Sequence, residues 1–174
     1  MTEEQRKLCG MLVMFPDGKR RITKEEFLRQ FPSAVECGRS AVRFLEDAYR
    51  TKNESDLEGA LIIGCTFGFP PEHKDILCRL IDEDWHCWHE SVVSILSGLW
   101  PTPDTVEALF RATQWVPKSL EYDDGKAMAR KAIYALGKIP GPEAETKLEI
   151  LARSDDPVLR GWAVKQLERR RTTT

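Results

Sequence analysis

The chain has 174 residues, 41% of them hydrophobic and 31% charged, which is typical of a folded globular protein and too apolar for a disordered one. The formal net charge of −2 excludes a global basic field for nucleic-acid binding, and five cysteines without a short CxxC pair argue against a secreted disulfide framework. The N-terminal segment is too polar for a signal peptide, and no apolar run approaches the roughly 20 residues that span a bilayer. We therefore expect a cytoplasmic protein with no membrane partner.

The first 52 residues predict a helical cap of less regular pattern than the rest of the chain. Thr23 opens a capping-box sequence ahead of an apolar pair, and residues 33–50 predict a helix. The inward positions of that helix are Val42, Leu45 and Tyr49. Residues 16–18 are a turn signal, and we favour helix–turn–helix over a small hairpin for residues 9–22.

From residue 53 onward, three segments share one pattern, in which an acidic residue precedes apolar positions at four-residue spacing. The segments begin at Asp84, Asp124 and Asp155. Their apolar positions are Trp88, Val92 and Leu96, then Met128, Ala132 and Leu136, then Leu159, Ala163 and Leu167. Steps of four residues place these side chains on one helical face, and the leading aspartate is suited to cap its helix.

Second helices are predicted after Pro-containing breaks. They cover residues 72–81, 104–113 and 143–153, and an upstream helix covers residues 57–67. Paired helices that repeat every 30–45 residues or so are the signature of an α-solenoid, in which each unit buries its face on its neighbours.

Two stretches, Ala132–Pro140 and Leu148–Ala163, resemble HEAT repeats of the short bacterial kind that phycobilin-lyase-type proteins also contain. The resemblance implies an all-α, HEAT-like α-solenoid of stacked antiparallel helical hairpins over residues 53–174, one continuous domain capped by residues 1–52. The segment at Asp84 departs from the family pattern, since Trp88-His89 stands near the usual Val-Arg site. The resemblance implies a fold and says almost nothing about function.

The residues between Asp82 and Glu90 form the richest cluster of functional side chains. His86 and His89 are three positions apart, so on a helix they would share a face and could hold a metal, with Cys87, Asp84 or Glu90 as a further ligand. A plainer interpretation is an inter-repeat turn with packed tryptophans and surface histidines. A third is a partner-binding hot spot, since hot spots use Trp for contact area. We predict no metal and no cofactor, and place partner binding at Asp84, Trp85, His86, Trp88, His89 and Glu90.

A long connection over residues 115–125 is the second candidate, because inserted loops of solenoids often carry the binding face. We predict that Glu121, Tyr122, Asp123 and Asp124 there contact a basic partner. The alternative is that Asp123 or Asp124 simply caps the next helix.

Charge on the predicted second helices disfavours a nucleic-acid partner. Residues 72–81, 104–113 and 143–153, together with Asp82 and Glu83 just after the first of them, carry nine acidic and five basic side chains, which does not suit a phosphate-binding groove. The basic run at 169–171 is typical of a solvated helix end, where cations complement the helix dipole.

No nucleophile-elbow, P-loop, dinucleotide-binding or HExxH motif is present in the sequence, and we expect no enzymatic activity. The favoured hypothesis is a monomeric, non-catalytic scaffold that binds another protein through an acidic concave face. Within that class, the chain is similar to bacterial immunity proteins that neutralise a basic toxin domain. The alternatives are a lyase-like tetrapyrrole or metal-binding protein, a glycosylase-like enzyme, and a regulatory subunit of a larger complex.

Overall fold

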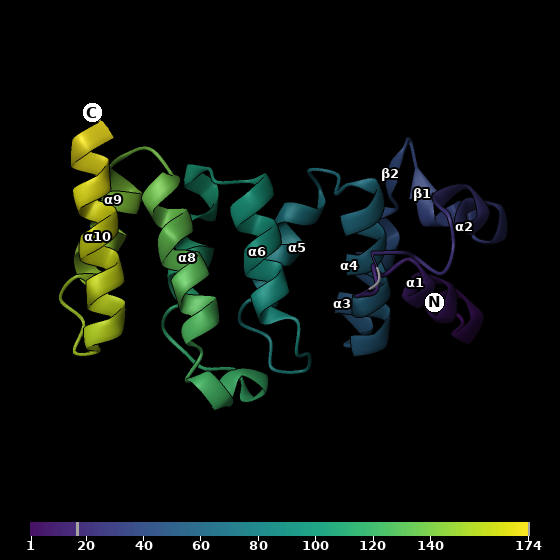
Figure 1. The fold of residues 1–174 in the computed structure, drawn as a ribbon, viewed down its shortest axis with the longest axis horizontal. Coiled ribbons are helices and arrows are strands. Elements are labelled where there is room, and N and C mark those ends of the chain that lie inside the picture. The colour runs from purple at the N-terminus through teal and green to yellow at the C-terminus, as the bar shows by residue number, and fades with distance from the viewer. Residues whose placement is uncertain (17, 174) are drawn as a thin grey trace. The chain divides into compact units, whose positions relative to one another are not determined.

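Helices make up most of the structure, a computed structural model that describes residues 1–16 and 18–173. Within these residues there are ten α-helices, three short 3-10 helices and one two-stranded hairpin, which confirms the predicted all-α class (Figure 1). The chain divides into two units, Met1–Ile76 and Leu77–Thr174, and the boundary falls within α5 (His73–Leu80).

The first unit is organised around its longest helix, which packs against two others. Helix α4 (Glu54–Phe67) contacts α1 (Glu3–Met11) and α3 (Val42–Thr51), while α2 (Lys24–Gln30) and η1 (Pro32–Ala34) follow each other closely. The predicted boundary between cap and repeats, after residue 52, therefore lies inside the first unit.

Aromatic rings fill the core of the first unit. Phe27 is fully buried, and its ring centroid lies 5.8 Å from that of Phe31 and 5.7 Å from that of Phe67. The helix that carries Phe27 begins as its sequence predicts, since the Thr23 hydroxyl accepts a hydrogen bond from the Glu26 backbone N–H at 3.1 Å. Cys9 lies in the same core, and burial raises the pKa of its thiol to about 12.

The helix predicted over residues 33–50 is wrong in its first half. Residues 35–40 form a hairpin of β1 (Val35–Glu36) and β2 (Arg39–Ser40), and helix begins only at Val42. The two loop residues, Cys37 and Gly38, have φ angles of 50° and 81°. A two-residue hairpin loop needs positive φ at both positions, and Gly supplies one of them without strain.

Residues 9–22 fit the favoured helix–turn–helix only in part. Helices flank this segment, but α1 ends at Met11 and the residues before α2 are not helical. The Phe15 N–H donates to the Lys19 carbonyl at 3.0 Å, so the chain reverses here. Asp17, the middle of the predicted turn at 16–18, lies outside the described residues.

Gly64 is a position where a side chain cannot be added without cost. It is buried in α4, and a Cβ there would lie 2.2 Å from the Phe69 ring. We expect Gly64→Ala to lower the free energy of unfolding by about 1–3 kcal/mol, the usual cost of overpacking. Gly10→Ala is the control, because a Cβ at that α1 position meets nothing within 4 Å. Urea unfolding checks both variants; equal midpoints would contradict the expectation.

The second unit contains two rows of helices. Helices α6 (His89–Leu99), α8 (Lys126–Lys138) and α10 (Pro157–Thr173) form one row, in which α8 packs against both neighbours (Figure 1). Helices α7 (Val106–Arg111) and α9 (Pro142–Leu151) contact each other and both pack against α8. Short helices η2 (Pro103–Thr105) and η3 (Lys118–Asp123) stand before α7 and α8.

The apolar positions predicted for the first helices of the repeats face inward. Six of the nine are buried and the remaining three, Trp88, Leu159 and Leu167, are half-buried. Two of the three helices have an aspartate that bonds to a first-turn N–H, one residue away from the expected position, whereas α6 has no side-chain cap at its N-cap residue, Trp88. Asp123 accepts from the Ala127 N–H at 2.9 Å, and Asp156 accepts from the Val158 N–H at 2.8 Å.

Candidate partner-binding site

The candidate site lies on two loops of the second unit. The first loop comprises residues 81–88, between α5 and α6, and the second loop comprises residues 112–125, between α7 and α8. Both lie at the end of the unit where α6 and α8 begin (Figure 1). The two segments that the sequence singled out separately are therefore neighbours in space.

The first loop is not helical, so the prediction of a helix led by Asp84 is wrong in its first turn: α6 begins only at His89. The His86 imidazole explains the difference. Its Nδ1 accepts from the Trp88 backbone N–H at 3.1 Å, and its Nε2 lies 2.9 Å from the Leu80 carbonyl oxygen. Hydrogen bonds from a side chain to nearby backbone groups compete with helix formation, and here they stabilise the loop.

The histidines are buried, which contradicts the interpretation that placed them at the surface. His86 is 5% exposed and His89 is 1% exposed. Their rings are stacked with centroids 4.1 Å apart, and His89 Nε2 lies 2.6 Å from the Glu83 carbonyl oxygen. Because a carbonyl only accepts, that nitrogen carries the proton.

His89 also connects the two loops. Its ring makes an edge contact with the Trp115 ring of the second loop, at a centroid distance of 5.3 Å. Trp85 extends the same aromatic cluster, with an edge contact to His86 at 4.9 Å and an indole N–H that donates to Glu83 at 2.8 Å. The four rings of Trp85, His86, His89 and Trp115 thus form a continuous base beneath both loops.

The acidic members of the candidate site divide into exposed and structural groups. Asp84, Glu121 and Asp124 are exposed. Glu90 is half-buried and pairs with Lys131 of α8 at 2.6 Å, and Asp123 is half-buried as the cap of α8. The alternative that assigned helix capping to Asp123 is therefore confirmed for that residue.

The large aromatic side chains of the candidate site also differ in exposure. Tyr122 is 77% exposed, more than any other large hydrophobic side chain among the described residues. Trp88 is half-buried, and its indole nitrogen is enclosed without a hydrogen-bond partner. Beside the second loop lies a hollow of about 390 Å³, whose lining includes Trp115, Asp124 and the Lys126–Asp156 ion pair.

Charge on the two loops is strongly one-sided. Residues 82–90 contain four acidic side chains and no Lys or Arg, and residues 115–125 contain three acidic side chains and one lysine, Lys118. We call this surface the acidic loop edge, defined by Asp84, Glu121, Tyr122 and Asp124. Asp82 belongs to the same loop but is bound by Arg111 at 2.9 Å.

Metal coordination has no geometric support here. Among the described residues, no group of three His, Cys, Asp or Glu side chains is arranged so that it could hold a metal ion. Both nitrogens of His86 are bonded to backbone groups, and the protonated nitrogen of His89 is bonded as well.

None of the described helices combines the length and apolar character needed to cross a bilayer.

Burial has a consequence for acid stability. It lowers the pKa of the His89 imidazole, and it lowers that of His73 in the first unit. As the pH falls through about 6.5, the unfolded chain takes up protons at these histidines while the folded chain does not. We therefore expect stability to fall with decreasing pH below about 6.5, by at most about 1.4 kcal/mol per pH unit for each histidine.

Urea unfolding at a series of pH values checks this expectation, and His89→Gln is the matched variant. Glutamine has no group that titrates in this range but retains an N–H that can donate to a carbonyl. The slope of stability against pH should be smaller in the variant. Equal slopes would show that His89 makes no contribution.

The fold and the site together define a mostly helical protein with an acidic, aromatic surface on two neighbouring loops. Comparison with protein-family models, with curated proteins and with solved structures finds no match to this chain.

Proposed function

We propose that this chain is a non-catalytic, HEAT-like scaffold that binds a basic protein through the acidic loop edge. The hairpins α6–α7 and α8–α9 would be two repeats and α10 the start of a third. A role as an inhibitor or immunity protein for a basic toxin domain is the specific form that we favour. A small acidic inhibitor associates quickly with a basic target because the opposite charges steer the encounter.

The observation that carries this proposal is the contrast between the surface and the base of the loop edge. Exposed carboxylates and the Tyr122 ring belong to loops that rest on a cluster of four rings, in which His86 and His89 are buried and Trp85 and Trp115 are half-buried. Loops that are already ordered lose little entropy on binding, which favours affinity. An exposed tyrosine beside carboxylates is also a typical hot-spot composition.

The second helices also carry acidic side chains, but a groove on those helices is a poorer candidate surface than the acidic loop edge. Two of their acidic side chains are already occupied, since Glu107 binds Lys147 at 2.7 Å and Glu145 approaches Arg170; Asp82, just after α5, binds Arg111. These pairs connect neighbouring helices. Their structural role leaves the loops as the better surface for a partner.

The test is retention of a partner from a lysate of the source cell at low salt, with the full chain immobilised. We expect one basic protein to be retained in an equimolar amount. Asp84→Lys combined with Glu121→Lys, one change in each loop, should weaken its binding by about tenfold or more. The cause is the replacement of attraction by like-charge repulsion.

The matched control is Glu46→Lys combined with Glu149→Lys, which makes the same change in net charge on exposed helix positions. It should bind as the unmodified chain does. Failure to retain any equimolar protein would overturn the proposal. A partner that both double variants lose equally would place the binding surface elsewhere.

A further inference from the structure

A second charged surface lies on helices that the acidic loop edge does not use. Helix α8 carries four Lys and Arg residues and no Asp or Glu, and α10 carries five with a single acidic residue, Glu168. The two helices pack side by side. One pair of helices in the second unit is therefore basic, although the whole chain has a net charge of −2.

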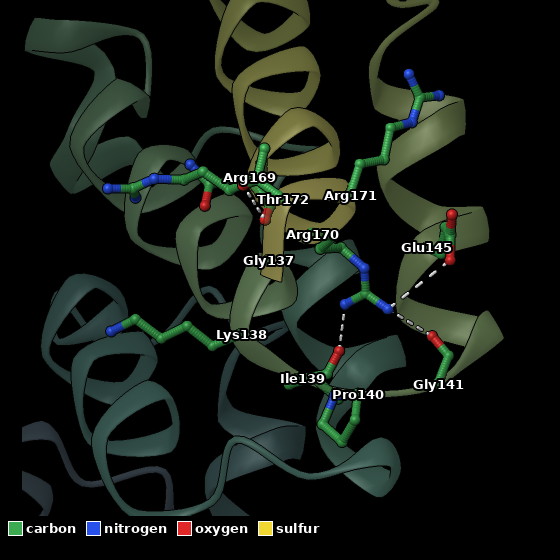
Figure 2. Close-up of a pocket in the computed structure, with 11 residues that line it drawn as sticks. Gly137, Lys138, Ile139, Pro140, Gly141, Glu145, Arg169, Arg170, Arg171 and Thr172 are labelled. Atoms are coloured by element: carbon green, nitrogen blue, oxygen red, sulfur yellow. Dashed lines mark hydrogen bonds and ion pairs between the residues drawn. The ribbon is translucent and has the colours of Figure 1, made fainter. Parts of the chain in front are cut away.

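Several of these nine cations are bound by neighbouring groups. Lys126 pairs with Asp156, Lys131 pairs with Glu90, and Arg160 donates to the Ser154 carbonyl at 2.6 Å. Arg170 donates to the carbonyls of Ile139 and Gly141, at the end of α8 and the start of α9 (Figure 2). Lys131 and Arg160 are exposed, and so are five further cations, namely Arg130, Lys138, Lys165, Arg169 and Arg171.

Four of the five share one face of the helix pair. Lys138 and Arg169 occupy the same position in the two aligned repeat segments, and Figure 2 shows both side chains extending to the same side from neighbouring helices. Arg130 lies eight residues before Lys138 in α8, and Lys165 lies four residues before Arg169 in α10. Each pair therefore shares one face of its helix. Tyr134 lies between Arg130 and Lys138, half-buried, with the Arg130 guanidinium 5.7 Å from its ring. We call this surface the basic face.

Helix-dipole pairing accounts for only part of this arrangement. Cations in a last turn complement the partial negative charge there, which explains Lys138 and Arg171. It does not explain Arg130 or Lys165, which lie in earlier turns. Nor does it explain the lack of acidic side chains along all of α8.

A pocket of about 780 Å³ opens at the end of the basic face, where Lys138, Arg169 and Arg171 line it (Figure 2). Gln166 also lines it; this side chain is 3% exposed, and its Nε2 has no hydrogen-bond partner. Gly141, the N-cap of α9, is a lining residue, and no side chain caps that helix. One carboxylate is present, that of Glu145, 3.9 Å from Arg170. The pocket thus offers donors and positive charge, which suits an oxyanion.

We propose that the basic face binds the phosphate backbone of a nucleic acid, with the pocket beside Lys138 and Arg169 receiving one phosphate group. From Arg130 to Lys138 the helix rises about 12 Å, a length over which one strand of a duplex carries three or four phosphates. Neighbouring helix axes lie about 8–10 Å apart, so the cations form a two-dimensional array. Binding of this kind is independent of base sequence, because no side chain here is placed to read base edges.

The test is fluorescence anisotropy with a labelled oligonucleotide of about 20 nucleotides, single-stranded and as a duplex, at about 50 mM salt. We expect binding that weakens linearly in log–log form as salt rises. Lys138→Glu combined with Arg169→Glu should reduce affinity about tenfold or more and make the salt dependence shallower. The control is Lys118→Glu combined with Arg153→Glu, which makes the same change in net charge away from the basic face and should change affinity by less than about threefold.

Circular dichroism melting of both double variants establishes that they fold. Absence of binding by the unmodified chain at low salt would overturn the proposal, as would equal losses in the two double variants. A poly-glutamate competitor decides between nucleic acid and an acidic protein. If it displaces the oligonucleotide as well as unlabelled nucleic acid does at equal charge, the basic face binds acidic polypeptides and the proposal fails. The acidic loop edge is untouched in the Lys138 and Arg169 variant, so the two proposals fail independently.

Discussion

His89→Ala is expected to lower the free energy of unfolding of the second unit by about 2–4 kcal/mol. The substitution removes a fully buried ring that stacks on His86 and contacts Trp115. It also leaves the Glu83 carbonyl without its hydrogen-bond donor at 2.6 Å. Loss of packing and loss of a buried hydrogen bond therefore add at one position. Urea unfolding followed by tryptophan fluorescence measures the effect.

The control for His89→Ala is Ser91→Ala, a half-buried position in the same first turns of α6. That change should alter stability by no more than about 0.5 kcal/mol. We also expect His89→Ala to weaken partner binding, even though the side chain cannot touch a partner, because both loops would lose their common support. Unchanged stability in His89→Ala would show that the aromatic cluster does not hold the loops.

Most of the helical fold could be predicted from spacing alone. Positions such as Val92, Leu96 and Ala132 are buried because a four-residue step returns to the same helical face, and no distant contact alters that geometry. Prolines marked the helix boundaries equally well: Pro142 stands in the first turn of α9, where a missing N–H costs nothing.

The errors arose where a local conformation depends on a particular backbone or side-chain hydrogen bond. Residues 33–41 have acceptable helical spacing, but Cys37 and Gly38 adopt positive φ and form a hairpin instead. The Cys37-Gly38 pair was the available signal, although a weak one, because Cys is not a typical residue in such turns. The first loop failed to form a helix because His86 bonds to backbone groups, which periodicity does not reveal.

Residue type indicated the correct candidate site, but it did not indicate that the two histidines are buried. A cluster of Trp and His drew attention to the correct loops, but the sequence did not show that Trp115 would meet His89 across them. Counting charge on the second helices alone also hid the basic face, which lies on α8 and α10. A net charge near zero can thus conceal two surfaces of opposite sign.

The Tyr122→Ala variant distinguishes the exposed surface of the acidic loop edge from the rings that support it. With 77% of the side chain exposed, its removal should change the free energy of unfolding by no more than about 0.5 kcal/mol. Its effect on binding should be large, since a tyrosine at the centre of an interface contributes about 2 kcal/mol or more, equivalent to roughly 30-fold in affinity. Titration calorimetry with the retained basic protein measures this change.

Leu99→Ala is the matched control, because Leu99 is 50% exposed and lies at the far end of α6 from the loops. It removes a similar apolar surface at a place where we expect no partner. If Tyr122→Ala binds normally while Leu99→Ala does not, the binding surface lies at the opposite end of the second unit. If both bind normally while Asp84→Lys with Glu121→Lys does not, the partner recognises the charge of the acidic loop edge without using its aromatic side chain. The pattern of His89, Tyr122 and Leu99 variants therefore distinguishes a pre-organised hot spot from a purely electrostatic surface.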